Sequence, residues 1–245
     1  MKKTIIFTIV STVACLATAA SNAPVTMNAS LDVDYSNVSL WRGLKTEQDV
    51  TRATLNVKSG GLLGTPIKLG ATMQMMSPKQ QLDPRASAIG VNASATADIA
   101  KHLAFTTEVG TIRNNFTRTG VYTEVYGAVT LDRFLYVEKI ATPTVRYVYN
   151  VANSRSGVEL ELSRPITFDR IYTTLTPYAA VGVFQHYSYA YPAIRADIAI
   201  AKNLSLFGNF QYVNNWDKRL TSPRDLTAGQ SSQSHVFGGG LSFRF

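Results

Sequence analysis

Two side chains near position 187 could act together chemically. His186 and Ser188, in the stretch FQHYS, are two residues apart, so in an extended strand their side chains share a face. A histidine beside a serine can serve as the general base that activates the hydroxyl as a nucleophile. That role also requires a third group to orient the histidine, and the sequence identifies none. A polar pair without catalytic function therefore remains the alternative.

The remaining histidines, the cysteine and the basic residues argue against a metal site, a disulfide framework and nucleic-acid binding. His102 and His235 lie in other segments, so no metal-ligand spacing appears, and nothing indicates a metal or a cofactor. The sole cysteine, Cys15, lies in the N-terminal segment, which excludes a disulfide framework in the rest of the chain. The formal charge is +8, but the basic residues do not cluster with aromatic ones, so nucleic acid is not an expected partner.

The elements that would position these residues begin after an N-terminal export segment. Residues 1–20 have the pattern of a cleaved signal peptide: Lys2 and Lys3, an apolar run to about Leu16, and small residues around Ala19. The apolar run is too short for a transmembrane helix. Removing 20 of the 245 residues leaves 225, which we expect to form one domain over 21–245.

Period-two alternation runs through this domain. In the stretch RATLNVKS, Ala53, Leu55 and Val57 share one face, while Arg52 and Lys58 lie on the other. The same pattern predicts twelve strands of the length that crosses a bilayer at a tilt, at 30–43, 50–59, 67–76, 89–100, 103–113, 119–131, 142–150, 156–164, 172–186, 192–201, 204–214 and 234–245.

The connections and face compositions favour a membrane barrel over a soluble β-sandwich. We expect tight turns such as 165–170 after even-numbered strands, and longer polar loops such as 44–49 after odd-numbered ones. One face carries many small apolar residues and the other carries charges in mid-strand, which suits lipid outside and water inside. The sequence thus predicts an all-β fold: a transmembrane, antiparallel, up-and-down barrel of about 12 strands in the cell outer membrane, both termini periplasmic.

Aromatic residues near the strand ends predict two interfacial girdles. Phe105, Phe134 and Phe207 fall near the tight turns, and Tyr189, Tyr191 and others fall near the longer loops. The final strand would close against the first, which removes its free edge. A last strand ending on Phe243 and Phe245 resembles the signal read by the barrel assembly machinery, which that resemblance implies as a partner.

The stretch SNVSLWRGLKTEQ resembles the opening strand of the TorF-like family of Gram-negative outer-membrane porins. Trp41, Arg42 and Gly43 carry the match, and YTEVYGAV at 122–129 is a weaker echo. This chain departs from the family pattern by an extra residue between Ser36 and Trp41 and by the lack of a tyrosine there. The resemblance implies a channel-like role.

The inward face is expected to carry both signs of charge, so the lumen is either an aqueous pore or plugged by its own ion pairs. The predicted function is porin-like passive diffusion of small polar solutes, with a non-conducting scaffold or adhesin-type barrel as the alternative. The predicted lumen residues are Asp32, Asp34, Arg52, Lys58, Lys68, Asp98, Glu108, Glu124, Arg146, Glu159, Glu161, Arg195, Asp197 and Arg244.

Two further interpretations concern the predicted outer rim. The His-x-Ser pattern of His186 and Ser188 resembles lipid A 3-O-deacylases, although Tyr189 stands where those enzymes carry asparagine. Basic residues at the same rim would pair with phosphates of lipopolysaccharide, an expected partner beside the membrane lipids. They are Lys45, Lys79, Arg85, Arg113, Arg118, Arg155, Lys218, Arg219 and Arg224.

Overall fold

The computed structural model of the chain describes residues 27–41, 44–60, 67–78, 87–117, 120–134, 139–151, 154–185, 188–215 and 233–245. These residues form one thirteen-stranded sheet. Its strands are β1 (Met27–Trp41), β2 (Leu44–Ser59), β3 (Ile67–Pro78), β4 (Ser87–Ala100), β5 (Leu103–Thr117), β6 (Gly120–Phe134), β7 (Thr142–Asn150), β8 (Arg155–Ser163), β9 (Ile166–Phe168), β10 (Thr173–Phe184), β11 (Ser188–Ala201), β12 (Leu204–Asn215) and β13 (Gln233–Arg244). No helix among them is long and apolar enough to cross a membrane.

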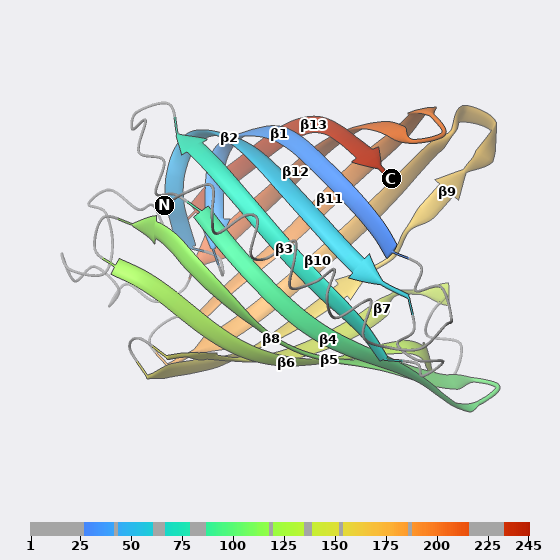
Figure 1. Cartoon of the computed structure of the whole chain (residues 1–245), viewed down its shortest axis with the longest axis horizontal. Helices are drawn as coiled ribbons and strands as arrows, with labels where there is room; N and C mark the ends of the chain where they lie inside the picture. Colours follow the sequence, from blue (N-terminus) through green and yellow to red (C-terminus); the bar gives the residue numbers. More distant parts are fainter. Residues whose placement is uncertain are drawn as a thin grey trace.

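The sheet closes on itself to form an antiparallel barrel (Figure 1). The first and last strands in the chain close the barrel: β13 pairs with β1, from Ser30 opposite Arg244 to Ser36 opposite Gly238. Both β8 and β9 pair with β10, so they form one wall strand that is interrupted at Arg164 and Pro165. The barrel wall therefore has twelve strands, and this confirms the predicted all-β, antiparallel barrel of about 12 strands. The periplasmic location of both termini stays a prediction.

Two predicted connections are wrong in detail. The stretch expected to be a tight turn at 165–170 contains β9 and a 3-10 turn, η3 (Asp169–Ile171). Pro165 has no amide hydrogen to donate, which explains why the strand is broken before it resumes as β9. The stretch expected to be a loop at 44–49 is the start of β2, where Lys45 pairs with Leu40.

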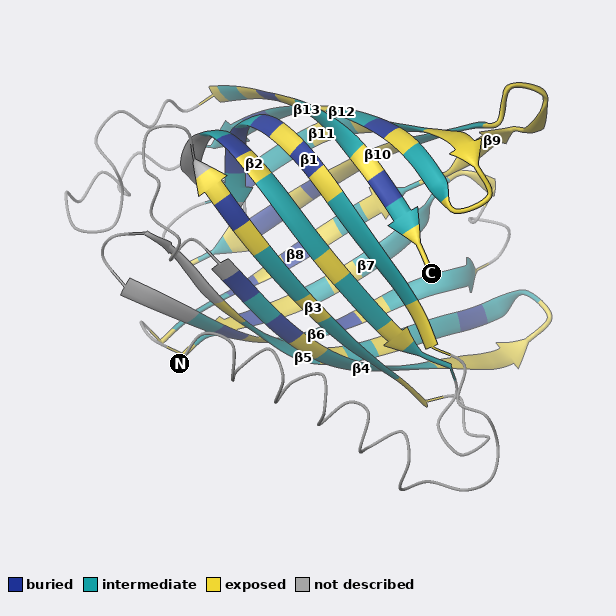
Figure 2. Cartoon of the chain, turned by 45° about the horizontal axis from the view of Figure 1, so that its top comes forward, coloured by how far each residue is buried: buried dark blue, intermediate teal, exposed yellow. Residues whose placement is uncertain are grey.

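Apolar side chains cover the outside of the barrel. Large apolar residues such as Val109 and Val183 are 62% and 57% exposed, and they alternate along their strands with less exposed residues. Figure 2 shows this as exposed bands separated by intermediate and buried ones on the same strands. Such an apolar outer wall is the surface that a hydrocarbon environment solvates.

The two ends of the barrel differ in what they hold. At one end, here called the terminal end, the backbone of Ala29 exchanges hydrogen bonds with that of Phe245, and Arg244 N–H donates to Asn203 O at 2.9 Å. The short turns at 101–102 and 202–203 lie at this end. At the other end, here called the loop end, β1, β3, β5, β7, β10 and β12 reach their last residues.

Candidate functional site

The register places the predicted lumen residues on the inward side of the wall. Asp34, for example, is 8% exposed between Val33 and Tyr35, which are 39% and 45% exposed. The same alternation continues through the strand pairs, so the other thirteen predicted residues share the inward side. Of the family motif, Trp41 ends β1, and Arg42 and Gly43 lie outside the described residues.

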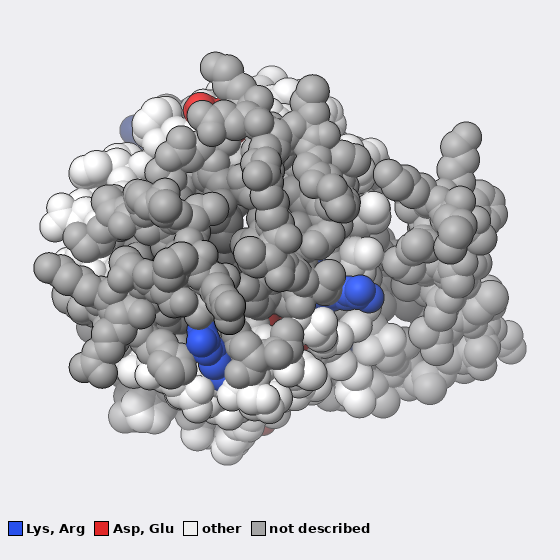
Figure 3. Space-filling view, turned by 90° about the vertical axis from the view of Figure 1, so that its left-hand side faces the viewer, with Lys and Arg blue, Asp and Glu red and all other residues white. Residues whose placement is uncertain are grey.

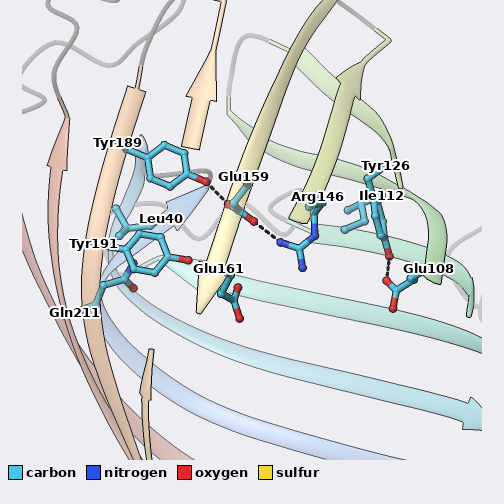
Figure 4. A pocket seen from close by; sticks show the side chains of 10 residues that line it. All are labelled: Leu40, Glu108, Ile112, Tyr126, Arg146, Glu159, Glu161, Tyr189, Tyr191 and Gln211. Carbon is cyan, nitrogen blue, oxygen red and sulfur yellow. Dashed lines mark hydrogen bonds and ion pairs between the residues drawn. The ribbon is translucent and has the colours of Figure 1, made fainter. Parts of the chain in front are cut away.

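A cavity of about 320 Å³ lies in the lumen. Figure 4 shows that its side chains come from many strands around the wall and point toward a common space. Apolar, phenolic, amide and charged groups line it together: Leu40, Glu108, Ile112, Tyr126, Arg146, Glu159, Glu161, Tyr189, Tyr191 and Gln211. A polar cavity of this size holds several water molecules.

A three-residue network forms one side of this cavity. Arg146 on β7 makes an ion pair with Glu159 on β8, and the hydroxyl of Tyr189 on β11 donates a hydrogen bond to the same carboxylate. Glu159 and Tyr189 are buried, so these charges and hydroxyls depend on each other for their partners. The network follows the wall from β7 to β11 and does not cross the lumen (Figure 4).

Glycines on neighbouring strands make room for the tyrosine rings. Tyr126 donates a hydrogen bond to Glu108 at 2.7 Å while its ring lies over Gly110, where a Cβ atom would be 2.6 Å from the Tyr126 hydroxyl. Tyr189 lies over Gly182 in the same way, with its hydroxyl 2.8 Å from the position of such a Cβ. The rings therefore lie against the wall of the cavity.

A second cluster of charges lies near the closing strands. Arg52 on β2 binds Asp34 on β1 through two nitrogens, at 2.7 and 3.1 Å. Arg195 on β11 binds Asp197 two residues further on, and its guanidinium lies 4.1 Å from the centre of the Phe207 ring. These pairs also run along the wall, between adjacent strands or within one strand.

Near the terminal end the inward charges are more exposed. Asp98 on β4 pairs with Arg133 on β6, with side chains 71% and 42% exposed. Lys58, Lys68 and Arg244 also lie near the terminal end of the barrel. At the loop end, seen in Figure 3, the basic side chains of the described residues that are visible lie at separate places.

The girdle prediction is wrong for three aromatic residues. Phe207, Tyr189 and Tyr191 face the lumen and not the lipid, because each shares its strand face with inward charged residues or their partners. Tyr126, which the sequence places on the same strand face as Glu124, and Tyr178 were not among the predicted lumen residues. Strand parity is the signal that finds the lumen aromatics: Tyr126 alternates in step with Glu124, and Tyr189 and Tyr191 with Arg195.

Of the two residues proposed for hydrolysis, the structure describes only Ser188. Ser188 pairs with Val183 and has the outward parity, opposite to Tyr189, while His186 lies outside the described residues. Among the part of the chain that the structure describes, no group of three or more possible ligands could hold a metal ion. The deacylase interpretation remains an untested prediction.

The fold and the polar lumen define a class: a twelve-stranded barrel with the architecture of outer-membrane porins. It is similar to the solved NanC porin, with a TM-score of 0.53, 11% identity, and coverage of 87% of this chain and 98% of that one. It is equally similar to the KdgM porin, with a TM-score of 0.53, 10% identity, and coverage of 88% and 99%. At these identities the likeness shows the fold alone.

A third similar structure is the KdgM porin in complex with disordered oligogalacturonate, with a TM-score of 0.52, 8% identity, and coverage of 89% and 99%. No protein-family model and no curated protein sequence matches the chain. The resemblance of Trp41, Arg42 and Gly43 to TorF-like porins therefore remains a prediction.

Proposed function

We propose that this protein is an outer-membrane porin that lets small polar solutes diffuse passively through its lumen. The observation that carries the proposal is the direction of the side-chain pairs. Arg52–Asp34 and Arg146–Glu159 each join adjacent strands, and Tyr126 and Tyr189 lie flat over glycines. Groups that satisfy one another along the wall leave a polar cavity, whereas a plugged barrel needs contacts across it.

Conductance across a planar bilayer tests the proposal. Purified, folded protein is expected to produce discrete current steps, and the same preparation boiled in detergent is expected to produce none. Resistance to SDS before boiling, followed by a mobility shift after boiling, confirms that the inserted protein is a folded barrel. A folded protein that stays silent over a wide voltage range would support the non-conducting scaffold instead.

The setting in the cell is part of the proposal. Residues 1–20 would direct export and be removed, and the terminal end of the barrel would face the periplasm. Phe243 and Phe245 would then present the assembly signal to the barrel assembly machinery. Fractionation of cells should place the protein in the outer membrane, and N-terminal sequencing should place its first residue near position 20 or 21. Recovery in the soluble periplasm alone would refute the localisation.

Basic residues at the loop end are proposed to bind lipopolysaccharide. Arg113 on β5 is exposed on the outer face, Arg155 begins β8, and Lys45 lies on β2, while the other six candidates lie outside the described residues. Guanidinium groups bind phosphates through paired hydrogen bonds. Neutralising Lys79, Arg85, Lys218, Arg219 and Arg224 together should weaken co-purification of lipopolysaccharide without preventing barrel assembly. Unchanged co-purification would refute this role.

A further inference from the structure

We infer that the lumen selects cations over anions, and that one belt of charged side chains sets this selectivity. The inference rests on the proposed function, because only a conducting barrel has an ion preference. The belt, called the central belt below, comprises inward-facing charged residues near the middle of their strands. They are Asp32, Asp34, Arg52, Glu108, Arg146, Glu159, Glu161, Arg195 and Asp197.

The central belt is acidic as a whole. Its six carboxylates and three guanidinium groups leave a formal charge of −3. Each of the three arginines is bound to a carboxylate of the belt: Arg52 to Asp34, Arg146 to Glu159 and Arg195 to Asp197. The positive charges are thus compensated at short range, and an anion entering the belt finds each guanidinium already occupied.

The other three belt carboxylates, Asp32, Glu108 and Glu161, add negative charge on different parts of the wall. Glu108 on β5 accepts a hydrogen bond from the phenol of Tyr126, which supports the carboxylate without cancelling its charge. Asp32 on β1 has a buried Oδ1 with no hydrogen-bond partner among the described residues. Asp32 also lies within electrostatic range of Arg195 on β11.

Neighbouring basic residues offset this field only in part. Lys68 lies in register with Ser94 and so with Glu108, and Arg244 lies opposite Ser30, two residues from Asp32, but both are solvent-exposed. Beside the central belt, the inward faces of β3 and β4 carry neutral side chains such as Thr72, Gln74 and Asn92. Lys58 is six residues further along β2 than Arg52, which is about 20 Å along the strand. This exceeds the screening length of about 8 Å at physiological salt, so the exposed ammonium group of Lys58 acts weakly at the belt under those conditions.

A narrow lumen amplifies the effect of the belt. Low-dielectric walls focus the field of like charges and raise the local concentration of counter-ions by about tenfold or more. A mobile cation is therefore enriched at the narrow, acidic middle of the barrel, while a mobile anion of equal size is depleted. Organic solutes should follow the same rule, so an amine-bearing polar molecule should pass faster than a carboxylate of similar size.

The reversal potential in a potassium chloride gradient tests the inference. For the intact protein in a planar bilayer, we expect a permeability ratio of potassium to chloride of about tenfold at physiological ionic strength, which decreases as ionic strength rises further. The double variant Asp32→Asn and Glu108→Gln removes two charges and keeps both side-chain shapes. It should conduct with a clearly smaller ratio.

The matched control neutralises an equal number of charges outside the belt. The double variant Lys58→Gln and Asp98→Asn should leave the ratio close to that of the unchanged protein. A conducting protein that prefers chloride, or a belt variant with an unchanged ratio, would overturn the inference while leaving the proposed function intact. Absence of any current from folded protein would refute the proposed function itself.

A second measurement needs no variant and so does not depend on the folding of one. Liposomes containing the unchanged protein should take up glucosamine, a cation at neutral pH, several-fold faster than glucuronate, an anion of similar size. Liposomes without protein provide the background rate. Equal uptake of the two sugars, or faster uptake of glucuronate, would overturn the cation preference.

Discussion

The closing seam of the barrel and the wall of its cavity both depend on glycine, but for opposite reasons. At the closing seam, where β13 pairs with β1, a Cβ atom on Gly240 would overlap Val33 O and lie 2.6 Å from Asp34 Cα. In the cavity wall, a Cβ atom on Gly182 would meet the ring of Tyr189. Glycine therefore permits a close backbone approach in one region and accommodates a side chain in the other.

This difference determines how each region can respond to change. A ring can rotate away from a new methyl group, at the cost of its own hydrogen bond. A backbone that belongs to the last strand pair can move only by altering the pairing that closes the sheet. The closing seam should therefore be the less tolerant region, and the predictions below test this from the largest expected effect to the smallest.

The largest effect is expected from Gly240→Ala. The added methyl group meets the backbone of β1 at Val33 and Asp34, so β13 cannot keep its register with β1. Most of the protein should fail to form the SDS-resistant, heat-modifiable species on a gel. Gly208→Ala on β12 is the control, because its Cβ would meet only Gly238 O at 3.8 Å. Normal assembly of both variants would contradict the steric argument.

The next largest effect is expected from Glu159→Ala in the cavity wall. The change leaves the guanidinium of Arg146 and the hydroxyl of Tyr189 without the carboxylate that both contact. Removing one partner of a buried ion pair costs about 3–5 kcal/mol of unfolding free energy. Urea unfolding of the detergent-solubilised barrel measures this. Glu159→Gln keeps an acceptor for Tyr189 and should lose less than the alanine variant; equal losses would argue against a role for that hydrogen bond.

A smaller effect is expected from Gly182→Ala. The new methyl group displaces the Tyr189 ring and thereby weakens its hydrogen bond to Glu159, at about 1–3 kcal/mol for such overpacking. The same unfolding assay should show that its effect is not additive with that of Tyr189→Phe. Gly127→Ala is the control, since its Cβ would lie 4.0 Å from Glu108 O. Additive losses would mean that the two positions act independently.

The sequence predicted the strands well because the signal for them is repeated and local. Each strand faces lipid on one side, so alternation such as Ala53, Leu55 and Val57 recurs in all twelve, and the register then follows strand by strand. The short strand β9 was not predicted, because Pro165 and the charged residues Asp169 and Arg170 around it have the composition of a turn.

The candidate site was less predictable because its contacts join residues far apart in the chain. Tyr189 and Glu159 are thirty positions apart and lie on strands separated by β10, so no local pattern connects them. Residue type was also misleading: an aromatic residue near a strand end suits an interfacial girdle, but Phe207 packs under Arg195 in the lumen. Which aromatic residues line a barrel depends on parity and on glycines across the strand pair.

The smallest effect is expected where neither closing seam nor cavity is involved, in the ion pair between Asp98 and Arg133. Both side chains are largely exposed near the terminal end, so water already solvates them and salt screens their attraction. Asp98→Asn should cost no more than about 1 kcal/mol in urea unfolding. Because the carboxylate lies outside the central belt, the variant should also conduct with an unchanged permeability ratio. A loss of unfolding free energy as large as that of Glu159→Ala would show that burial does not explain the difference between the exposed Asp98–Arg133 pair and the buried Arg146–Glu159 pair.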